Sequence, residues 1–237
     1  MALTPTTSLA EIATANPSLR RELERLGLDY CCGGKRSLAE ACHLQDLDPD
    51  VIVAALVSLS GKTEQTQSDW ADLSPSDLVD HLESTHHRYL KQELPRLSAL
   101  TEKVSRVHGE KHPELVAVTE VFAQLRDDLE PHLRKEEQVL FPMIRTLAAA
   151  TSAPRFHCGS LSNPITVMER EHVVVGELLE KLRQITGGYQ APEGTCASTQ
   201  ALMEGLAQLE ADTHLHVHKE NNHLFPAVIA MEAALRG

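Results

Sequence analysis

The sequence predicts an all-α protein in which a small helical domain precedes an antiparallel four-helix bundle. Three observations lead to this prediction. Apolar residues recur at spacings of three and four through long segments after residue 74, no segment alternates apolar and polar residues as a strand does, and the second half of the bundle repeats the first. A chain of 237 residues has room for one large domain and a small one.

Residues 1–60 are predicted to form the small domain from short helices, because helix-capping signals recur there. Ser8 is followed three residues later by Glu11, and Ser37 by Glu40. In such a capping box, the hydroxyl and the carboxylate each accept a hydrogen bond from a free backbone N–H of the other residue. Each pair therefore marks the start of a helix.

Residues 61–73 are predicted to be a linker, since the opening GKTEQTQSD contains no apolar side chain and can bury nothing. The bundle is expected over 74–237, beginning where Ser74 is followed by Pro75. Short connections between four long helices favour an antiparallel arrangement. The helices are expected near 75–105, 114–147, 164–187 and 197–235.

Composition argues against two large classes of function. With 22 basic and 34 acidic residues the net charge is −12, so a nucleic-acid partner is not expected. The longest apolar run, 51–57, is far shorter than the roughly 20 residues that a membrane span needs. The N-terminus has no apolar secretion signal, and the five cysteines are irregularly spaced, which together predict a cytoplasmic protein with reduced thiols.

An internal repeat identifies the residues of interest. HLRKEEQVLFP at 132–142 and HVHKENNHLFP at 216–226 share the frame HxxKExxxLFP, 84 positions apart. Apolar residues at bundle spacing lead to the His and the Glu of each copy, which puts both on the inward face of the helix. Unpaired polar groups there would cost on the order of several kcal/mol, so something in the core must satisfy them.

The other helix of each half supplies one more His. His87 precedes His132 by 45 positions and His172 precedes His216 by 44, and the same apolar spacing follows both. His86 competes with His87, because it also lies one turn before the next core leucine, and only the register of the second half favours His87. Four imidazoles and two carboxylates are therefore expected to meet at mid-bundle.

These six side chains predict a pair of metal ions. Nitrogen and oxygen ligands without thiolates suit iron or manganese better than structural zinc, and inward carboxylates on bundle helices hold metal pairs. The expected cofactor is two iron ions per chain, bridged by Glu136, Glu220 and an oxo or hydroxo group, with an open position for O2 or NO. The alternative is that each HxxxE pair is an exposed ion pair worth a few tenths of a kcal/mol, roughly. The duplicated frame argues against it.

Two adjacent thiols are the notable feature of the small domain. Cys31 and Cys32 lie in the segment DYCCGGKR, just before a capped helix and beside Lys35 and Arg36. A helix N-terminus and nearby cations lower a thiol pKa, so both thiols are predicted to be reactive. The alternative is a pair of small packing residues, which is also what Cys42 is expected to be.

The remaining histidines are given no metal role. His214 and His218 lie about 200° around the helix from His216, so both are expected on the surface. His157 and Cys158 lie in the polar loop 151–164, where nothing supports a metal contact.

The sequence resembles the iron-sulfur cluster repair di-iron proteins, also called the repair of iron centres family. DYCCGGK and its neighbouring short helices look like the small N-terminal domain of that family, and the repeat looks like its hemerythrin-like bundle. The resemblance implies a function in restoring iron-sulfur clusters damaged by nitric oxide or oxidants, and a role for Cys31 and Cys32. The iron ligands that it implies are His87, His132, Glu136, His172, His216 and Glu220, with both glutamates as bridges.

Three functions compete at this point. The first is repair, in which the centre donates iron or manages NO at damaged clusters of other proteins. The second is an O2 or NO sensor or carrier, although oxygen-carrying hemerythrins use five histidines at the iron pair and this repeat supplies four. The third is a di-iron NO reductase with Cys31 and Cys32 as an electron relay, for which no nicotinamide or flavin motif is present.

Overall fold

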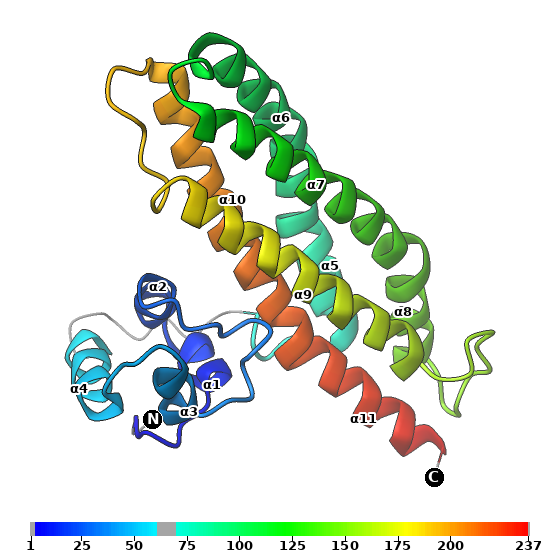
Figure 1. Cartoon of the computed structure of the whole chain (residues 1–237). Helices are drawn as coiled ribbons and strands as arrows, with labels where there is room; N and C mark the ends of the chain where they lie inside the picture. The colour runs from blue at the N-terminus through cyan, green and yellow to red at the C-terminus, as the bar shows by residue number, and fades with distance from the viewer. Residues whose placement is uncertain (1–2, 61–69, 237) are drawn as a thin grey trace.

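The computed structural model describes residues 3–60 and 70–236, and its regular structure is helical (Figure 1). No β-strand occurs within these residues, which confirms the all-α prediction. The N-terminal helices are α1 (Leu9–Ala15), α2 (Pro17–Arg25), α3 (Leu38–Leu44) and α4 (Pro49–Ser60). The bundle contains α5 (Pro75–Leu82), η1 (Glu83–His87), α6 (Arg88–His108), α7 (Pro113–Lys135), η2 (Glu136–Leu140), α8 (Phe141–Ala148), α9 (Ser162–Ile185), α10 (Ala197–Lys219), η3 (Glu220–Leu224) and α11 (Phe225–Arg236).

The small N-terminal helices begin where the capping signals predict. Ser8 and Glu11 form a complete capping box at α1, and Ser37 and Glu40 form another at α3. Leucines from the four helices, together with Cys42, form one apolar core. Cys42 is fully buried there, as expected. Most of the predicted linker, residues 61–69, lies outside the described residues, so the division into domains at this segment stays a prediction.

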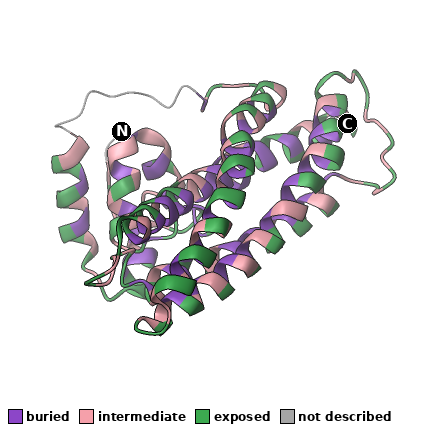
Figure 2. Ribbon diagram, turned by 90° about the horizontal axis from the view of Figure 1, so that it is seen from above, coloured by how far each residue is buried: buried purple, intermediate pink, exposed green. Residues whose placement is uncertain are grey.

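The four long helices of the bundle agree with the predicted ranges to within three residues at each end. The helix α6 packs against α7 and α10, and α9 packs against the same two helices, which closes a four-sided bundle. Figure 2 shows the buried residues on the sides of these helices that face one another. None of the described helices is both long enough and apolar enough to cross a membrane.

Three of the four long helices contain a π-helical turn, which the sequence analysis did not predict. In η2 the N–H of Phe141 bonds to the carbonyl of Glu136, and in η3 that of Phe225 bonds to Glu220, five residues back in each case. Proline follows at 142 and 226, the last position of the repeated LFP. Because proline has no N–H and its ring crowds the carbonyl four residues earlier, the wider turn accommodates it.

The interior of the bundle has two apolar clusters with a polar layer between them. One cluster includes Leu90, Leu129 and Leu209, and the other includes Leu82, Phe141 and Phe225. The residues that separate the two clusters along α5–α6, α7–α8 and α10–α11 are those of the predicted metal centre. The fold therefore surrounds this polar layer with hydrocarbon at both ends.

Candidate metal centre

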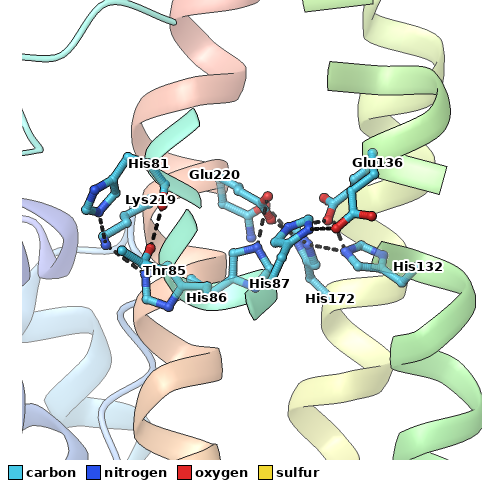
Figure 3. Close-up of polar contacts among 12 residues, drawn as sticks. His81, Thr85, His86, His87, His132, Glu136, His172, Lys219 and Glu220 are labelled. Atoms are coloured by element: carbon cyan, nitrogen blue, oxygen red, sulfur yellow. Dashed lines mark hydrogen bonds and ion pairs between the residues drawn. The ribbon is translucent and has the colours of Figure 1, made fainter. Parts of the chain in front are cut away.

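All six predicted ligands meet in the polar layer, and each is at most 2% exposed. Figure 3 shows five of them, together with His81, His86 and Lys219 on one side. His87 lies at the end of η1, and His172 lies on α9. The two repeat copies place each His in the last turn of an α-helix and each Glu at the first position of the π-turn that follows.

The ligand atoms form two groups that share both carboxylates. One group contains His87 and His216, the other contains His132 and His172, and Glu136 and Glu220 belong to each. Within a group, all ligand atoms lie within 4.8 Å of one another. Each histidine pair therefore combines one histidine from each half of the bundle, rather than the two histidines of one half.

Each glutamate lies close to one histidine of the first group and to one histidine of the second. The Glu136 oxygens lie 3.4 Å from His87 Nε2 and 3.3 Å from His132 Nε2. The Glu220 oxygens lie 3.1 Å from the Nε2 atoms of both His172 and His216. A carboxylate with one oxygen toward each of two cation positions has the geometry of a bridge between them.

Several ligand atoms have no hydrogen-bond partner among the described residues. They are His87 Nε2, both carboxylate oxygens of Glu136, and Glu220 Oε2. Burial of an unpaired polar atom costs about 1–3 kcal/mol, and more for a charged one. A positively charged ion between these atoms would satisfy all of them at once. The nitrogen and oxygen donor set suits iron, so these residues fit a pair of such ions.

The charges of the site are balanced by mutual contacts. Burial and the charge of Glu220 act to raise the pKa of Glu136, but its contacts with His132 and His87 outweigh them and hold the pKa below its ordinary value. Burial also acts to lower the pKa of His132, yet Glu136, Glu171 and Glu220 raise it to about 10. The carboxylates therefore stay ionised and demand positive charge, which protons supply where no metal does.

Three side chains outside the six orient the histidines, and the sequence analysis missed them. Each accepts a hydrogen bond from Nδ1, which leaves the Nε2 lone pair directed at the centre. The repeat contained a signal for two of the three side chains. Glu137 directly follows Glu136 and accepts from His87, and Asn221 directly follows Glu220 and accepts from His172. The bonds are His87 to Glu137 at 2.8 Å, His172 to Asn221 at 2.9 Å, and His132 to Glu171 at 2.9 Å.

His86 and His87 point in different directions. His86 Nδ1 lies 2.8 Å from Asp212, its Nε2 lies 2.7 Å from Lys219 Nζ, and its ring stacks on that of His216. His81 Nε2 also lies 2.8 Å from Lys219 Nζ. Burial lowers the pKa of Lys219 to about 8. His86 thus lies beside the centre, but both of its ring nitrogens are already hydrogen-bonded to other side chains.

The expectation that His218 lies on the surface is wrong. Its side chain is fully buried, and its ring lies edge-on against Tyr30 and Trp70. The angular position relative to His216 is as expected, but the N-terminal domain covers this side of α10. A helical wheel drawn from one helix cannot indicate that a second domain packs on its outer face.

The two thiols lie in a short segment, residues 29–34, that we call the Cys turn. Asp29 Oδ1 accepts from the backbone N–H groups of Cys31 and Cys32 and lies 3.1 Å from Cys31 Sγ. Cys31 is buried and Cys32 is exposed. The three side chains form a further group whose ligand atoms lie within 4.8 Å of one another. A cavity of about 390 Å³ separates the turn from α9.

The predicted lowering of the thiol pKa is wrong for Cys31. Its hydrogen bond to Cys32, its burial and the nearby Asp29 carboxylate all raise the pKa well above the usual thiol value. The sequence analysis weighed the cations at 35 and 36 and overlooked Asp29, which is the charged group that contacts the sulfur. The thiol of Cys31 is therefore protonated at neutral pH unless a cation replaces the proton.

Both parts of the chain match known protein families. Residues 78–228 match the hemerythrin HHE cation binding domain, and residues 6–60 match a domain of unknown function, DUF542. The chain is 34% identical over 224 residues to the iron-sulfur cluster repair protein YtfE of Escherichia coli O1:K1, covering 94% of this chain and 97% of that protein. The YtfE protein of Escherichia fergusonii matches with the same identity and coverage. The chain therefore belongs to the family of iron-sulfur cluster repair proteins that carry a hemerythrin HHE domain.

Proposed function

We propose that this protein repairs iron-sulfur clusters damaged by nitrosative or oxidative stress, and that it does so by supplying iron from a di-iron centre. The observation that carries the proposal is the buried group of four imidazoles and two carboxylates with unpaired ligand atoms. The similarity to the YtfE repair proteins over nearly the whole chain supports the same function. Its partners are then proteins with damaged clusters.

All six side chains take part in holding the two proposed ions. In this proposal His87 and His216 would hold one ion, His132 and His172 would hold the other, and both would share Glu136 and Glu220. When bound, the iron pair supplies redox chemistry, an open position for NO or O2, and iron that can be transferred. The carrier alternative gains no support, because His86, a further histidine beside the centre in the described part of the chain, is hydrogen-bonded to Asp212 and Lys219.

The protein's own residues keep the centre dry and its charge balanced. The two apolar clusters exclude bulk water from the layer between them. Without a metal ion His132 carries a proton at neutral pH, because Glu136, Glu171 and Glu220 raise its pKa to about 10. A metal ion at this imidazole would have to displace that proton, so acid would weaken metal binding there.

We propose that iron passes to the partner protein at the Cys turn. Asp29, Cys31 and Cys32 offer one carboxylate and two thiols close together, and Cys32 is exposed to a partner. Thiolates are the ligands that hold iron in iron-sulfur clusters, so a thiol pair is suited to pass iron to a damaged cluster. The NO reductase alternative would instead use these thiols as an electron relay.

The test is iron transfer to a damaged target. The protein loaded with ⁵⁷Fe is mixed, without oxygen, with a [4Fe–4S] hydro-lyase whose cluster has been damaged by NO, and recovery of hydro-lyase activity and of ⁵⁷Fe in the target is followed. We expect both from the loaded protein, slower recovery with the Cys31→Ser/Cys32→Ser variant, and none with the metal-free protein. Free Fe(II) at the same concentration is the control. Retention of both ions with steady consumption of NO and added reductant would favour the reductase instead.

A further inference from the structure

A single buried amide joins the metal centre to the Cys turn. Asn221 Oδ1 accepts from His172 Nδ1 at 2.9 Å, and Asn221 Nδ2 donates to the backbone carbonyl of Cys31 at 3.3 Å. The side chain of Asn221 is only 9% exposed. These two bonds settle which end of the amide faces the histidine and which end faces the thiol-bearing residue.

The Cys turn lies tightly against this part of η3. The neighbouring Asn222 donates to the carbonyls of Tyr30 and Cys31 at 3.2 and 3.1 Å. A Cβ at Gly34 would lie 2.5 Å from Asn222 Oδ1 and 2.6 Å from the Tyr30 carbonyl, closer than real Cβ contacts. A shift of η3 next to Glu220 is therefore passed directly to the turn, because no space separates them.

The internal repeat shows what is particular about Asn221. Its counterpart in the first half, Glu137, accepts from His87 in the same way, but its other contact is with Lys91 at the surface. A carboxylate can only accept hydrogen bonds, whereas an amide accepts with one end and donates with the other. Of these two residues within the described part of the chain, Asn221 bonds to a backbone carbonyl of the N-terminal domain and is an amide, whereas Glu137 bonds to Lys91 and is a carboxylate.

We propose that Asn221 is a positioning residue that couples occupancy of the metal centre to the conformation of the Cys turn. An ion bound to His172 Nε2 fixes the orientation of that ring and so directs Nδ1–H at Asn221. The oriented amide then holds the carbonyl of Cys31, and with it the position of the thiol. The inference rests on the proposed function, since it assumes that the six side chains bind metal and that the turn takes part in delivery.

The test measures amide hydrogen exchange of residues 31–36, with and without two equivalents of Fe(II) per chain in the absence of oxygen. It is carried out in the Cys31→Ser/Cys32→Ser background, which removes the thiols as metal ligands but keeps the backbone carbonyl that Asn221 binds. Three variants are compared there. Asn221→Ala removes both bonds, Asn221→Asp keeps the acceptor for His172 but loses the donor to Cys31, and Glu137→Ala is the matched control that removes an acceptor from a ligand histidine far from the turn.

We expect iron to slow exchange in the turn by about fivefold in the parent, the factor expected for one hydrogen bond. At Fe(II) concentrations that give two irons per chain in every variant, the effect should disappear in both Asn221 variants and persist in Glu137→Ala. Iron binding without any slowing in the parent, or equal slowing in Asn221→Asp, would overturn the coupling but leave the repair function intact. A parent that binds no iron would overturn both.

Discussion

Glu136 and Glu220 are the residues on which the centre depends most. Both carboxylates are fully buried, and each lies between two imidazoles, one from each of the two ligand groups. Burial acts to raise the pKa of Glu220, yet His216 and His172 hold it well below its ordinary value. An ionised carboxylate in hydrocarbon is tolerated only beside compensating positive charge, so these two side chains make the interior a cation site rather than a simple core.

Replacement of either bridge should reduce the metal content. Glu136→Ala or Glu220→Ala removes one oxygen from each ion and opens the site, so we expect a fall from two irons per chain to one or fewer, measured by elemental analysis of the purified protein. Glu120→Ala, at an exposed position of α7, is the control and should keep both ions. Two irons per chain in both bridge variants would show that the assignment is wrong.

The raised pKa of His132 predicts how the metal-free protein responds to pH. Burial opposes the shift, but contacts with Glu136, Glu171 and Glu220 raise the pKa from 6.5 to about 10. The stabilisation that this provides is therefore complete below pH 6.5 and is lost as the pH rises through 10. We expect the Tm of the metal-free protein to fall by more than about 3 °C between pH 6.5 and pH 10. The same scan on His132→Gln should show a clearly smaller fall, and identical curves would contradict the prediction.

At the scale of elements, a π-turn followed by Phe-Pro recurs in the two helices that carry the repeated ligands. The π-turns η2 and η3 start at Glu136 and Glu220 and end just before Phe-Pro. One residue more per turn rotates everything that follows by about 100° relative to a regular helix. The two halves of each long helix can then present their apolar faces to different clusters while the glutamate turns into the layer between them.

Removal of both prolines should separate metal binding from folding. We expect Pro142→Ala/Pro226→Ala to favour regular α-helix at η2 and η3, because alanine donates the N–H that proline lacks. The metal-free protein should unfold at the same or a higher temperature, while the iron affinity falls by about tenfold as the ligands move out of place. Pro95→Ala, within the regular helix α6, is the control and should leave iron affinity unchanged. Equal affinity in the double variant and the control would refute this role.

At the scale of the whole molecule, the N-terminal domain packs against α10, in the second half of the bundle. Val217 on α10 is part of the apolar core of that domain, and Trp70 and Tyr30 pack around His218. The Cys turn consequently lies against the residues that directly follow Glu220. The two parts of the chain thus pack together, and the Cys turn lies close to the candidate metal centre.

A side chain at Gly34 should loosen this contact without emptying the centre. In Gly34→Ala the new Cβ would overlap the side-chain amide of Asn222 and the Tyr30 carbonyl, so the backbone of the Cys turn must change shape and its hydrogen bonds with Asn222 are disturbed. We expect two irons per chain, faster proteolytic cleavage within residues 29–36, and slower transfer of iron to a damaged cluster. Gly176→Ala on α9 adds its Cβ to open space and should change none of the three. Unchanged cleavage and transfer in Gly34→Ala would count against the close contact.

Patterns along the chain were enough to predict the helices and the polar residues of the core. Spacing of apolar residues predicted the four long helices, and capping pairs predicted the starts of α1 and α3. The duplicated frame singled out four of the six residues that the structure gathers, and the matching apolar spacing in the other helix of each half added His87 and His172. These features are local or periodic, so they can be seen along the chain. Their assignment as iron ligands stays a prediction that metal analysis will decide.

Which distant groups meet depends on how the helices pack, and no pattern along the chain indicated it. It pairs His87 with His216 and His132 with His172, turns His86 toward Asp212 and Lys219, buries His218 under a second domain, and sets Asp29 rather than a cation beside Cys31. Each of these outcomes depends on the packing of one element against another, and the energy of a buried charge depends on what lies within a few ångströms in space rather than along the chain.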